Sequence, residues 1–389
     1  MRKLKIAFIF THFLPNIGGT EIPMYYYARG LILRGHKIIV LTAKTLGYKR
    51  ANLLSEEVIN GIKVRRLDFI PFPLYRQFMF APSLIKEVLS LKVDIILVFS
   101  LLPSFFLIVP ILLGKLKGIK IVLYPQFHPY RSLYRPSLIR CFDHAFIRTF
   151  GTWLLRLADH VIVLTKAEKN FCLKRNIENV SLLYEGVTFL PPLSKEEINY
   201  FLNKYNLHAE NYVVSVGRIE ERKGYDFLIR AVPYVIQKCP NTLFLIVGKD
   251  WGFLETCRNL AKQLKCEKYI RFLGELSKRE LHYVYSIADV VVIPSLFEAQ
   301  SRVVLEAFAH SKPLITTFNV GPSELVIKGG IRVPYGKVIQ LASVITLLLK
   351  RKDLARSLGE KGYDLVRELT WYNRIKILER ILLKIYNKE

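Results

Sequence analysis

Cysteine is scarce in this sequence of 389 residues, and the few cysteines follow no pattern. The five are Cys141, Cys172, Cys239, Cys257 and Cys266. No two of them form a C-x-x-C pair, which argues against a zinc site. An odd, scattered set also argues against a disulfide framework, so we expect reduced thiols and a cytoplasmic setting.

Short repeats, low-complexity tracts and a signal peptide are also missing. The start MRKLKIAFIF has a basic head but only a short apolar stretch and no cleavage site, which predicts a first strand. One uncharged run of nineteen residues, 95–113, has the length of a membrane span. Pro103 and Pro110 interrupt it, so we interpret it as a strand followed by a helix, with a span as the alternative.

Negative charge is in short supply, because 58 Lys and Arg face 32 Asp and Glu, for a net charge of +26. The first 190 residues hold 27 basic against 11 acidic residues (+16), and the rest hold 31 against 21 (+10). Such a charge attracts nucleic acid, anionic lipid or phosphorylated substrates, or forms an ordinary solvated surface. No nucleic-acid-binding motif is recognisable, so we expect no nucleic-acid partner.

Strand-like and helix-like stretches alternate in two rounds along the chain, which predicts parallel sheets covered by helices. The expected strands are 5–10, 37–43, 94–100, 120–126, 160–165, 211–217, 242–248, 270–274, 290–295 and 313–317. We therefore expect an α/β protein of two facing, Rossmann-like doubly wound domains with a ligand cleft between them. The expected parts are a first domain 1–190, a linker 191–210, a second domain 211–365, and a C-terminal helix 366–389 that returns to the first domain.

Two loops at expected strand ends have residues suited to phosphate. Gly18 and Gly19 precede a helix expected at 20–34, where backbone amides can approach a phosphate, although an ordinary turn is the alternative. Arg218 and Lys223 lie in GRIEERKG before a helix expected to start near residue 224, and two cations there suit a diphosphate. Solvated loop charge is the alternative, because acidic residues lie between them.

Two glutamates, Glu298 and Glu306, have seven residues between them. Glu298 follows an expected strand, and Glu306 lies about two turns into a helix that Ser301 could cap. Eight residues of helix span about 12 Å, which is the scale of a nucleotide sugar from its ribose to its hexose. Carboxylates accept hydrogen bonds from paired hydroxyls, so one glutamate could bind each end of such a nucleotide sugar. In the alternative, Glu306 pairs with a nearby cation and Glu298 is solvated.

Together these motifs resemble the family 4 glycosyltransferases, retaining enzymes with the GT-B fold. The resemblance covers essentially the whole chain. It is carried by the glutamate pair, by GRIEERKG, and by GGTE (18–21), GKDWGFLETCRNLAKQL (248–264) and VGPSELV (320–326).

The resemblance implies roles for named residues. Glu298 and His128 would contact the donor sugar, Glu306 the ribose, and Arg218 and Lys223 the diphosphate, so that no metal is needed. The implied catalytic residues are Glu298, His128, Arg218 and Lys223. The implied donor-binding residues are Gly18, Gly19, Gly217, Arg218, Lys223, Leu273, Gly274, Leu276, Glu298, Ala299, Gln300, Ser301, Arg302, Val303 and Glu306.

The sequence departs from the family pattern at several positions. The loop after the first glutamate usually reads Gly-Phe-Gly and is Ala299-Gln300-Ser301 here, followed by Arg302. Glu185 and Thr188 replace the ends of a usual Asn-Gly-Val-Asp segment. Val320 stands in a usual glycine pair, and Lys337 replaces a usual acidic residue. These changes leave the donor sugar open.

We therefore expect a retaining hexosyltransferase that uses a nucleotide diphosphate sugar and a glycan or lipid-linked acceptor. The basic first half, with arginines and aromatics interleaved in 72–80 and 127–140 and an apolar stretch at 103–118, predicts peripheral contact with an anionic membrane, at the inner face of the cell membrane. Two alternatives stay open: an epimerase on the same plan, and a catalytically silent subunit that binds nucleotide sugars.

Overall fold

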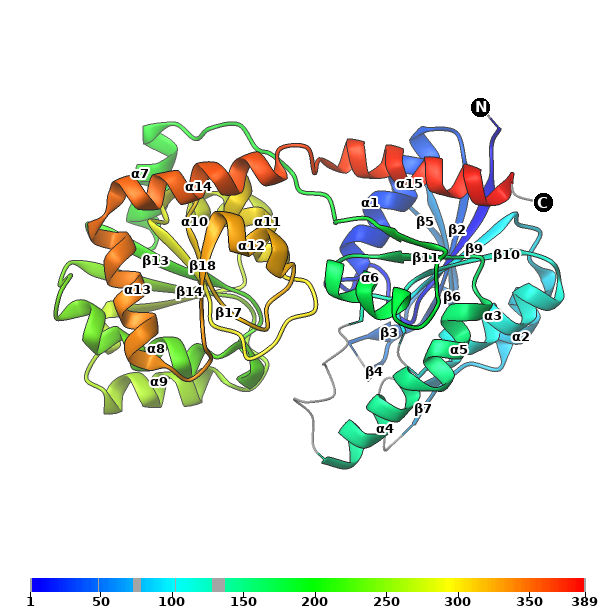
Figure 1. Ribbon diagram of the computed structural model, residues 1–389, viewed down its shortest axis with the longest axis horizontal. Helices are drawn as coiled ribbons and strands as arrows, with labels where there is room; N and C mark the ends of the chain where they lie inside the picture. Colours follow the sequence, from blue (N-terminus) through cyan, green and yellow to red (C-terminus); the bar gives the residue numbers. More distant parts are fainter. Residues whose placement is uncertain (1, 48, 73–77, 102, 128–136, 388–389) are drawn as a thin grey trace. The chain divides into compact units, whose positions relative to one another are not determined.

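A computed structural model describes residues 2–47, 49–72, 78–101, 103–127 and 137–387, except the side chains of 137–140 and 143 (Figure 1). The chain forms two compact units. Unit 1 comprises the residues up to Gly186 together with those from Trp371 onward, and unit 2 comprises Val187–Thr370. The segment 191–210, where we expected a linker, lies in unit 2 and contains helix α7 (Lys195–Lys204).

The described residues of unit 1 form an eight-stranded sheet with the order β12-β11-β10-β9-β1-β2-β6-β5. All neighbours pair in parallel except β5 and β6. The strands are β1 (Lys5–Ile9), β2 (Lys37–Ala43), β5 (Glu56–Ile59), β6 (Ile62–Leu67), β9 (Ile95–Phe99), β10 (Lys120–Tyr124), β11 (His160–Val163) and β12 (Val180–Leu182). Two short hairpins join β3 (Thr45–Leu46) with β4 (Lys49–Arg50), and β7 (Ile70–Pro71) with β8 (Met79–Phe80).

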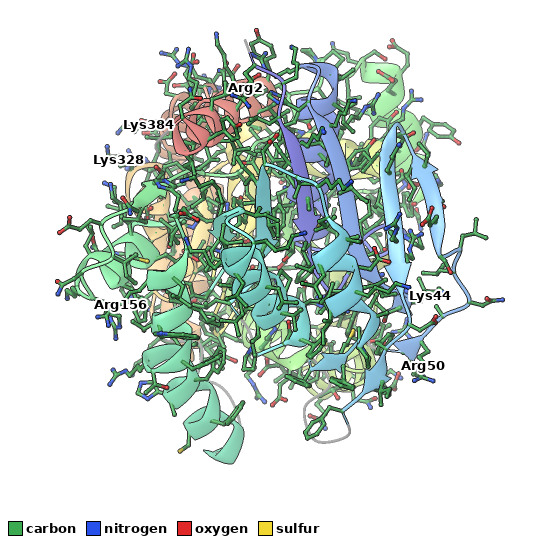
Figure 2. The ribbon with its side chains drawn as sticks, turned by 90° about the vertical axis from the view of Figure 1, so that its right-hand side faces the viewer. Arg2, Lys44, Arg50, Arg156, Lys328 and Lys384 are labelled. Carbon is green, nitrogen blue, oxygen red and sulfur yellow. The ribbon has the colours of Figure 1, made fainter. Side chains whose placement is uncertain are left out.

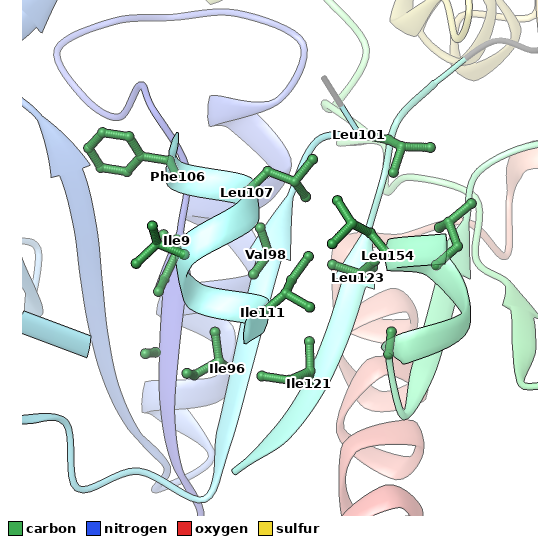
Figure 3. Packing of buried hydrophobic residues seen from close by; sticks show 14 of the residues in the cluster. Ile9, Ile96, Val98, Leu101, Phe106, Leu107, Ile111, Ile121, Leu123 and Leu154 are labelled. Atoms are coloured by element: carbon green, nitrogen blue, oxygen red, sulfur yellow. The ribbon is translucent and has the colours of Figure 1, made fainter. Parts of the chain in front are cut away.

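Apolar residues cover both faces of this sheet, as expected for a parallel sheet between helices. The helices are α1 (Glu21–Leu33), α2 (Ser83–Ser90), α3 (Phe105–Leu116), α4 (Ser137–Arg148), α5 (Phe150–Leu157), α6 (Lys166–Leu173) and α15 (Trp371–Tyr386). One core contains residues of α1 and α15, and the other contains residues of α2, α3, α5 and α6. In Figure 3, Phe106, Leu107 and Ile111 of α3 lie over Ile96 and Val98 of β9.

The long uncharged run is a strand and a helix, as we interpreted it. It comprises β9 and most of α3, which contains Pro110 and has twelve residues. Twelve residues of helix extend about 18 Å, well short of a bilayer core of about 30 Å. Among the described residues, no helix has both the length and the apolar character that crossing a membrane requires.

The residues of unit 2, all of them described, form a six-stranded parallel sheet with the order β15-β14-β13-β16-β17-β18. The strands are β13 (Asn211–Val216), β14 (Thr242–Val247), β15 (Ile270–Gly274), β16 (Val290–Ile293), β17 (Leu314–Thr317) and β18 (Gly330–Val333). The helices besides α7 are α8 (Tyr225–Ile236), α9 (Leu254–Gln263), α10 (Lys278–Ile287), α11 (Arg302–Ala309), α12 (Ser323–Gly329), α13 (Val338–Lys350) and α14 (Lys352–Val366). Short 3-10 turns lie at η2 (Glu221–Lys223) and η3 (Glu267–Tyr269).

The predicted α/β class with two Rossmann-like units is confirmed, and each of the ten expected strands is present. Several expected strands end one or two residues early, because the last letters of each motif belong to the following loop. Strands β5, β6, β12 and β18 and the short hairpin strands β3, β4, β7 and β8 were not expected. Strand β6, with the sequence IKVRRL, carries three cations, and β12 has only three residues, so neither has the continuous apolar run of the others.

Candidate active site

The candidate site of unit 2 lies where the strand order reverses. Strands β13 and β16 are parallel neighbours, with Val213 beside Val290, while the chain continues from β13 to β14 on one side and from β16 to β17 on the other. In open parallel sheets, ligands bind at the carboxyl ends of the strands at such a reversal. The loops that leave these two ends, 217–224 and 294–301, contain Lys223 and Glu298.

The two loops touch through their backbones. The amide of Leu296 donates to the carbonyl of Arg222 at 2.9 Å. Gly224 has φ +68°, and a Cβ there would lie 2.2 Å from the carbonyl oxygen of Pro294. A glycine is therefore required at this position both by the left-handed backbone and by the closeness of the neighbouring loop.

Lys223 and Glu298 form the central ion pair, with 2.9 Å between Lys223 Nζ and Glu298 Oε1. Their side chains are only 12% and 9% exposed. The hydroxyl of Ser295 donates to the same carboxylate oxygen at 2.6 Å. Burial would raise the pKa of Glu298, but the charge of Lys223 and the hydrogen bonds from Ser295 and Lys223 outweigh it and lower the pKa below its ordinary value. Glu298 is therefore an ionised carboxylate held in one place.

The backbone around Glu298 is fixed by a second segment. The amide of Glu298 donates to the carbonyl of Asn319, and the amide of Gly321 donates back to the carbonyl of Glu298, at 3.0 and 3.1 Å. Ser301 donates its amide to Gly321 at 2.8 Å. The segment VGPSELV, one of those that carry the family resemblance, thus supports the loop of the first glutamate.

Glu306 lies on α11, where two side chains hold its carboxylate. Tyr285 of α10 donates its hydroxyl to Oε2 at 2.9 Å, and Arg302 lies 3.6 Å from Oε1. Burial, followed by the charge of Glu306, raises the pKa of Tyr285 well above its usual value, so Tyr285 keeps its proton and donates. The pairing with a neighbouring cation that we considered as an alternative is therefore present, but the carboxylate stays about a quarter exposed.

The two cations of GRIEERKG are not equivalent. Lys223 is buried against Glu298, whereas the side chain of Arg218 is 45% exposed. The guanidinium of Arg218 lies 3.1 Å from Glu220 and 4.7 Å from the ring centre of Trp251. An exposed arginine at the end of a strand can turn toward an anion, because its bonds to Glu220 and Trp251 are screened by water.

Glycines allow close backbone contacts beside this site. Gly217 has φ +150°, and its carbonyl accepts from the hydroxyl of Tyr225 at 2.7 Å. A Cβ on Gly248 would lie 1.9 Å from that same carbonyl oxygen. Gly274, with φ +71°, accepts from the amide of Gly248 at 2.8 Å. The backbone from Leu273 to Leu276, which we expect to contact the nucleobase, therefore contains Gly274, the last of these close glycine contacts.

The loop that departs from the family pattern has polar atoms without partners. Both polar atoms of the Gln300 amide and the hydroxyl of Ser301 are buried, and none has a hydrogen-bond partner among the described residues. Buried polar groups are nearly always bonded, so we expect a water or a ligand to bond these three atoms. Our prediction that the Ser301 side chain caps α11 was wrong: Ser301 holds the N-cap position, but its hydroxyl does not reach the helix amides.

In unit 1, Gly18 and Gly19 lie directly before α1. The first of them faces the carboxylate of Glu21, because a Cβ on Gly18 would lie 2.6 Å from Glu21 Oε2, whereas no described atom would lie within 4 Å of a Cβ on Gly19. His12 anchors this loop by donating from Nε2 to the carbonyl of Gly47 at 2.7 Å. His128 lies outside the described residues, so its expected contact with the donor sugar stays a prediction.

Sequence reasoning missed several residues that support the site, among them Ser295, Tyr285 and Trp251. Ser295 was inside an expected strand, and a polar residue at the end of a strand is the signal that could have marked it. Tyr285 carries no such signal, because it lies in the middle of a helix twenty-one residues before Glu306. Among the described residues, no cluster of three or more His, Cys, Asp or Glu side chains could hold a metal ion.

Comparison with known proteins gives the same picture for the whole chain. Residues 17–188 match the family model described as Glycosyltransferase Family 4, and residues 197–365 match the model described as Glycosyl transferases group 1. The chain belongs to the family 4 glycosyltransferases. The first match ends two residues beyond Gly186, where the first segment of unit 1 ends, and the second match lies within unit 2.

Individual relatives agree with this assignment. An uncharacterized glycosyltransferase of Methanocaldococcus jannaschii is 28% identical over 341 residues, which is 83% of each chain. A GDP-mannose-dependent mannosyltransferase of Mycobacterium tuberculosis that acts on phosphatidylinositol monomannoside is 29% identical over 45% of this chain and 47% of its own. The solved structure of Anabaena HepE with UDP and glucose has a TM-score of 0.78 at 19% identity, and covers 98% of this chain and 100% of its own. That structural likeness establishes the GT-B fold.

Proposed function

We propose that this glycosyltransferase transfers a hexose, with retention of configuration, from a nucleotide diphosphate sugar to an acceptor hydroxyl. The observation that carries the proposal is the buried Lys223–Glu298 ion pair at the strand reversal, with Glu306 on the helix that follows. In the proposal, the cation serves the diphosphate and the neighbouring carboxylate serves the sugar. Retention is taken from the family resemblance.

In this proposal, each charged residue of the site in unit 2 has one task. Glu306 accepts hydrogen bonds from the ribose hydroxyls, and Lys223 and Arg218 neutralise the diphosphate as it leaves. Glu298 lies at the sugar, where its negative charge stabilises the positive charge that develops at C1. The bond from C1 to the diphosphate oxygen breaks, the acceptor oxygen bonds to C1, and the acceptor proton passes to the departing diphosphate. Gly18 and Gly19 would add backbone amides to the phosphates, which stays a prediction.

The donor is expected to be identified by a thermal-shift screen against nucleotide sugars, because a ligand that binds only the folded state raises the midpoint. The relatives make UDP and GDP sugars the first to test. Gln300→Ala should lose most of the discrimination among sugars but bind the free nucleoside diphosphate as before, since the unpartnered Gln300 amide lies in the loop expected at the sugar. Gln263→Ala, an exposed change on α9, is the control.

Product analysis of the same samples then separates the alternatives. Transfer to an acceptor with retained configuration would support the proposal. Turnover of the donor sugar with no acceptor present would instead identify an epimerase, and binding without transfer or hydrolysis would identify a silent subunit. No binding of any nucleotide sugar would contradict the proposal altogether.

We also propose that unit 1 contacts an anionic membrane and takes a lipid-linked acceptor. Residues 73–77 and 128–136, with Arg131 and Arg135 among them, lie outside the described residues, as does the side chain of Arg140. Among the described residues, α4 and α5 expose Phe142, Phe150 and Trp153, and Arg156 lies on the same helix as the last two. Figure 2 also shows Lys44 and Arg50 on the opposite side of the unit, so the basic charge is not confined to one patch.

Flotation of the purified protein with liposomes tests the membrane contact. Binding is expected to require anionic lipid and to weaken with salt, since each cation near the surface contributes about 1 kcal/mol. It should fall when Arg131, Arg135 and Arg140 are changed to glutamine. Protein that stays unbound at low salt with anionic vesicles would rule the contact out. Binding that resists high salt and carbonate would favour insertion over surface contact.

A further inference from the structure

Two histidines of unit 2 form a contact that the proposed chemistry does not use. His282 lies on α10, and His310 is the residue that ends α11. Nδ1 of His282 and Nε2 of His310 are 2.7 Å apart. His282 is buried, with 7% of its surface exposed. No motif in the sequence marks either residue.

The other two ring nitrogens show how many protons the pair holds. Nε2 of His282 lies 2.9 Å from the carbonyl oxygen of Pro191, and Nδ1 of His310 lies 2.7 Å from that of Glu306. A carbonyl oxygen only accepts hydrogen bonds, so both nitrogens carry a hydrogen. The contact between the rings needs a third hydrogen. Two neutral imidazoles have only two, so the pair as arranged holds one extra proton and one positive charge.

The environment decides which ring is charged. Burial, assisted by the facing His282 and by Lys312, lowers the pKa of His310 to about 4. His310 is therefore the neutral ring, with its hydrogen on Nδ1 and a lone pair on Nε2. His282 then donates both to His310 and to the carbonyl of Pro191, and the extra proton belongs to the pair.

The pair is connected to Glu306 by two routes. His310 donates to the main-chain carbonyl of Glu306, and the ring of His310 packs on Tyr285 with 5.0 Å between ring centres. Tyr285 in turn donates to the Glu306 carboxylate. On its other side, the pair holds Pro191, which lies in the segment between the end of unit 1 and α7.

The elements packed around the pair bring further charged groups. Lys312 donates to the carbonyl of Ser286, and Gly359 of α14 lies against Ser311 without a titratable side chain. The titratable and charged groups of α10 besides His282 are Lys278, Arg279, Glu280, Tyr283 and Tyr285, and those of α11 are Arg302 and Glu306. Lys312 follows α11, and Glu197 of α7 pairs with Arg279.

We propose that the His282–His310 pair positions Glu306 for the nucleotide, and does so only while it holds its extra proton. The inference rests on the proposed function, because it treats Glu306 as a ligand of the ribose. When the proton leaves, one hydrogen bond in the row Pro191–His282–His310–Glu306 is lost. The hydrogen bond that this proton makes is therefore present at low pH and is lost at higher pH, when the pair gives up the proton. Nucleotide affinity therefore weakens as the pH rises.

Calorimetric titration of UDP and GDP between pH 5.5 and 8.5 tests this positioning role. His282→Gln keeps an amide donor but has no titrating group, and His208→Gln, an exposed change in the same unit, is the control. The ratio of the Kd of His282→Gln to that of the wild type should change about five-fold over this range, the factor for one net hydrogen bond. The ratio for His208→Gln should stay constant. Ionisation of the nucleotide's own phosphates affects the Kd of every form equally, so it cancels in both ratios.

The thermal midpoint of the protein without nucleotide, measured over the same pH range, is the second readout. The difference in midpoint between the wild type and His282→Gln should change with pH, because only the wild-type pair gains and loses the shared proton, and His310→Asn should also remove this pH step. Parallel midpoint curves for the wild type and both variants would overturn the shared proton. A constant Kd ratio with normal nucleotide binding would overturn the positioning of Glu306. Failure of every form to bind UDP or GDP would contradict the proposed function, while the midpoint curves would still report on the proton.

Discussion

Glu298→Gln is expected to lower kcat by about 100- to 1,000-fold, the scale for losing one preorganised electrostatic partner of a transition state. The glutamine has the same size and can still accept from Ser295, but it has no charge to stabilise C1. The carboxylate is ionised in the folded protein, because Lys223 and Ser295 hold its pKa below the ordinary value despite burial. The affinity for a free nucleoside diphosphate should stay nearly unchanged, since Glu298 is assigned to the sugar.

Glu306→Ala is the matched comparison and should weaken the nucleotide itself, by about ten-fold or more. It removes the ribose acceptor and leaves the buried hydroxyl of Tyr285 without its partner. Titrating UDP or GDP into both variants, together with initial rates, separates the two roles. Glu255→Gln, an exposed change in the first turn of α9, controls for the loss of charge. An equal loss of nucleotide affinity in Glu298→Gln and Glu306→Ala would contradict the division of labour.

The positions of Lys223 and Glu298 could be predicted from the sequence, but their contact could not. Each follows an apolar run that reads as a buried strand, and strand ends in parallel sheets carry ligand residues. Strands β13 and β16 are separated by about seventy residues and two further strands, and nothing in the local pattern says that they are neighbours. We therefore expected a phosphate ligand and a sugar ligand, and the structure adds an ion pair between them.

Features that depend on the direction of a side chain could not be predicted from the sequence either. Ser301 stands at the start of α11, as a capping residue would, yet its hydroxyl is buried without a partner because the backbone of the loop is held by Gly321. His282 and His310 meet only because α10 and the end of α11 lie side by side. Neither the spacing of residues nor the composition of the sequence predicts this packing. Local patterns predict elements and their ends, whereas contacts between elements depend on the order of the strands.

Lys223→Ala is expected to lower kcat/KM by an amount that corresponds to about 2–4 kcal/mol of lost transition-state stabilisation. The reason is that the lysine is the buried cation assigned to the diphosphate. Arg218→Ala should fall at the lower end of the same range, since its guanidinium is nearly half exposed and engaged with Glu220. Lys249→Ala, an exposed change two residues after the end of β14, is the control. Activity should survive a chelator, because these cations neutralise the leaving group. Activity that vanished with chelator and returned with magnesium would contradict this scheme.

The pH profile gives Lys223→Ala a second, independent signature. In the wild type, the charge and hydrogen bond of Lys223 help to hold the pKa of Glu298 below its ordinary value against the effect of burial. Without the lysine, burial dominates and the pKa of Glu298 rises. The acidic limb of the kcat/KM profile should therefore move to higher pH in Lys223→Ala but not in Arg218→Ala, whose guanidinium bonds Glu220 rather than Glu298. An unmoved acidic limb in Lys223→Ala would show that Glu298 is not the group whose ionisation the reaction requires.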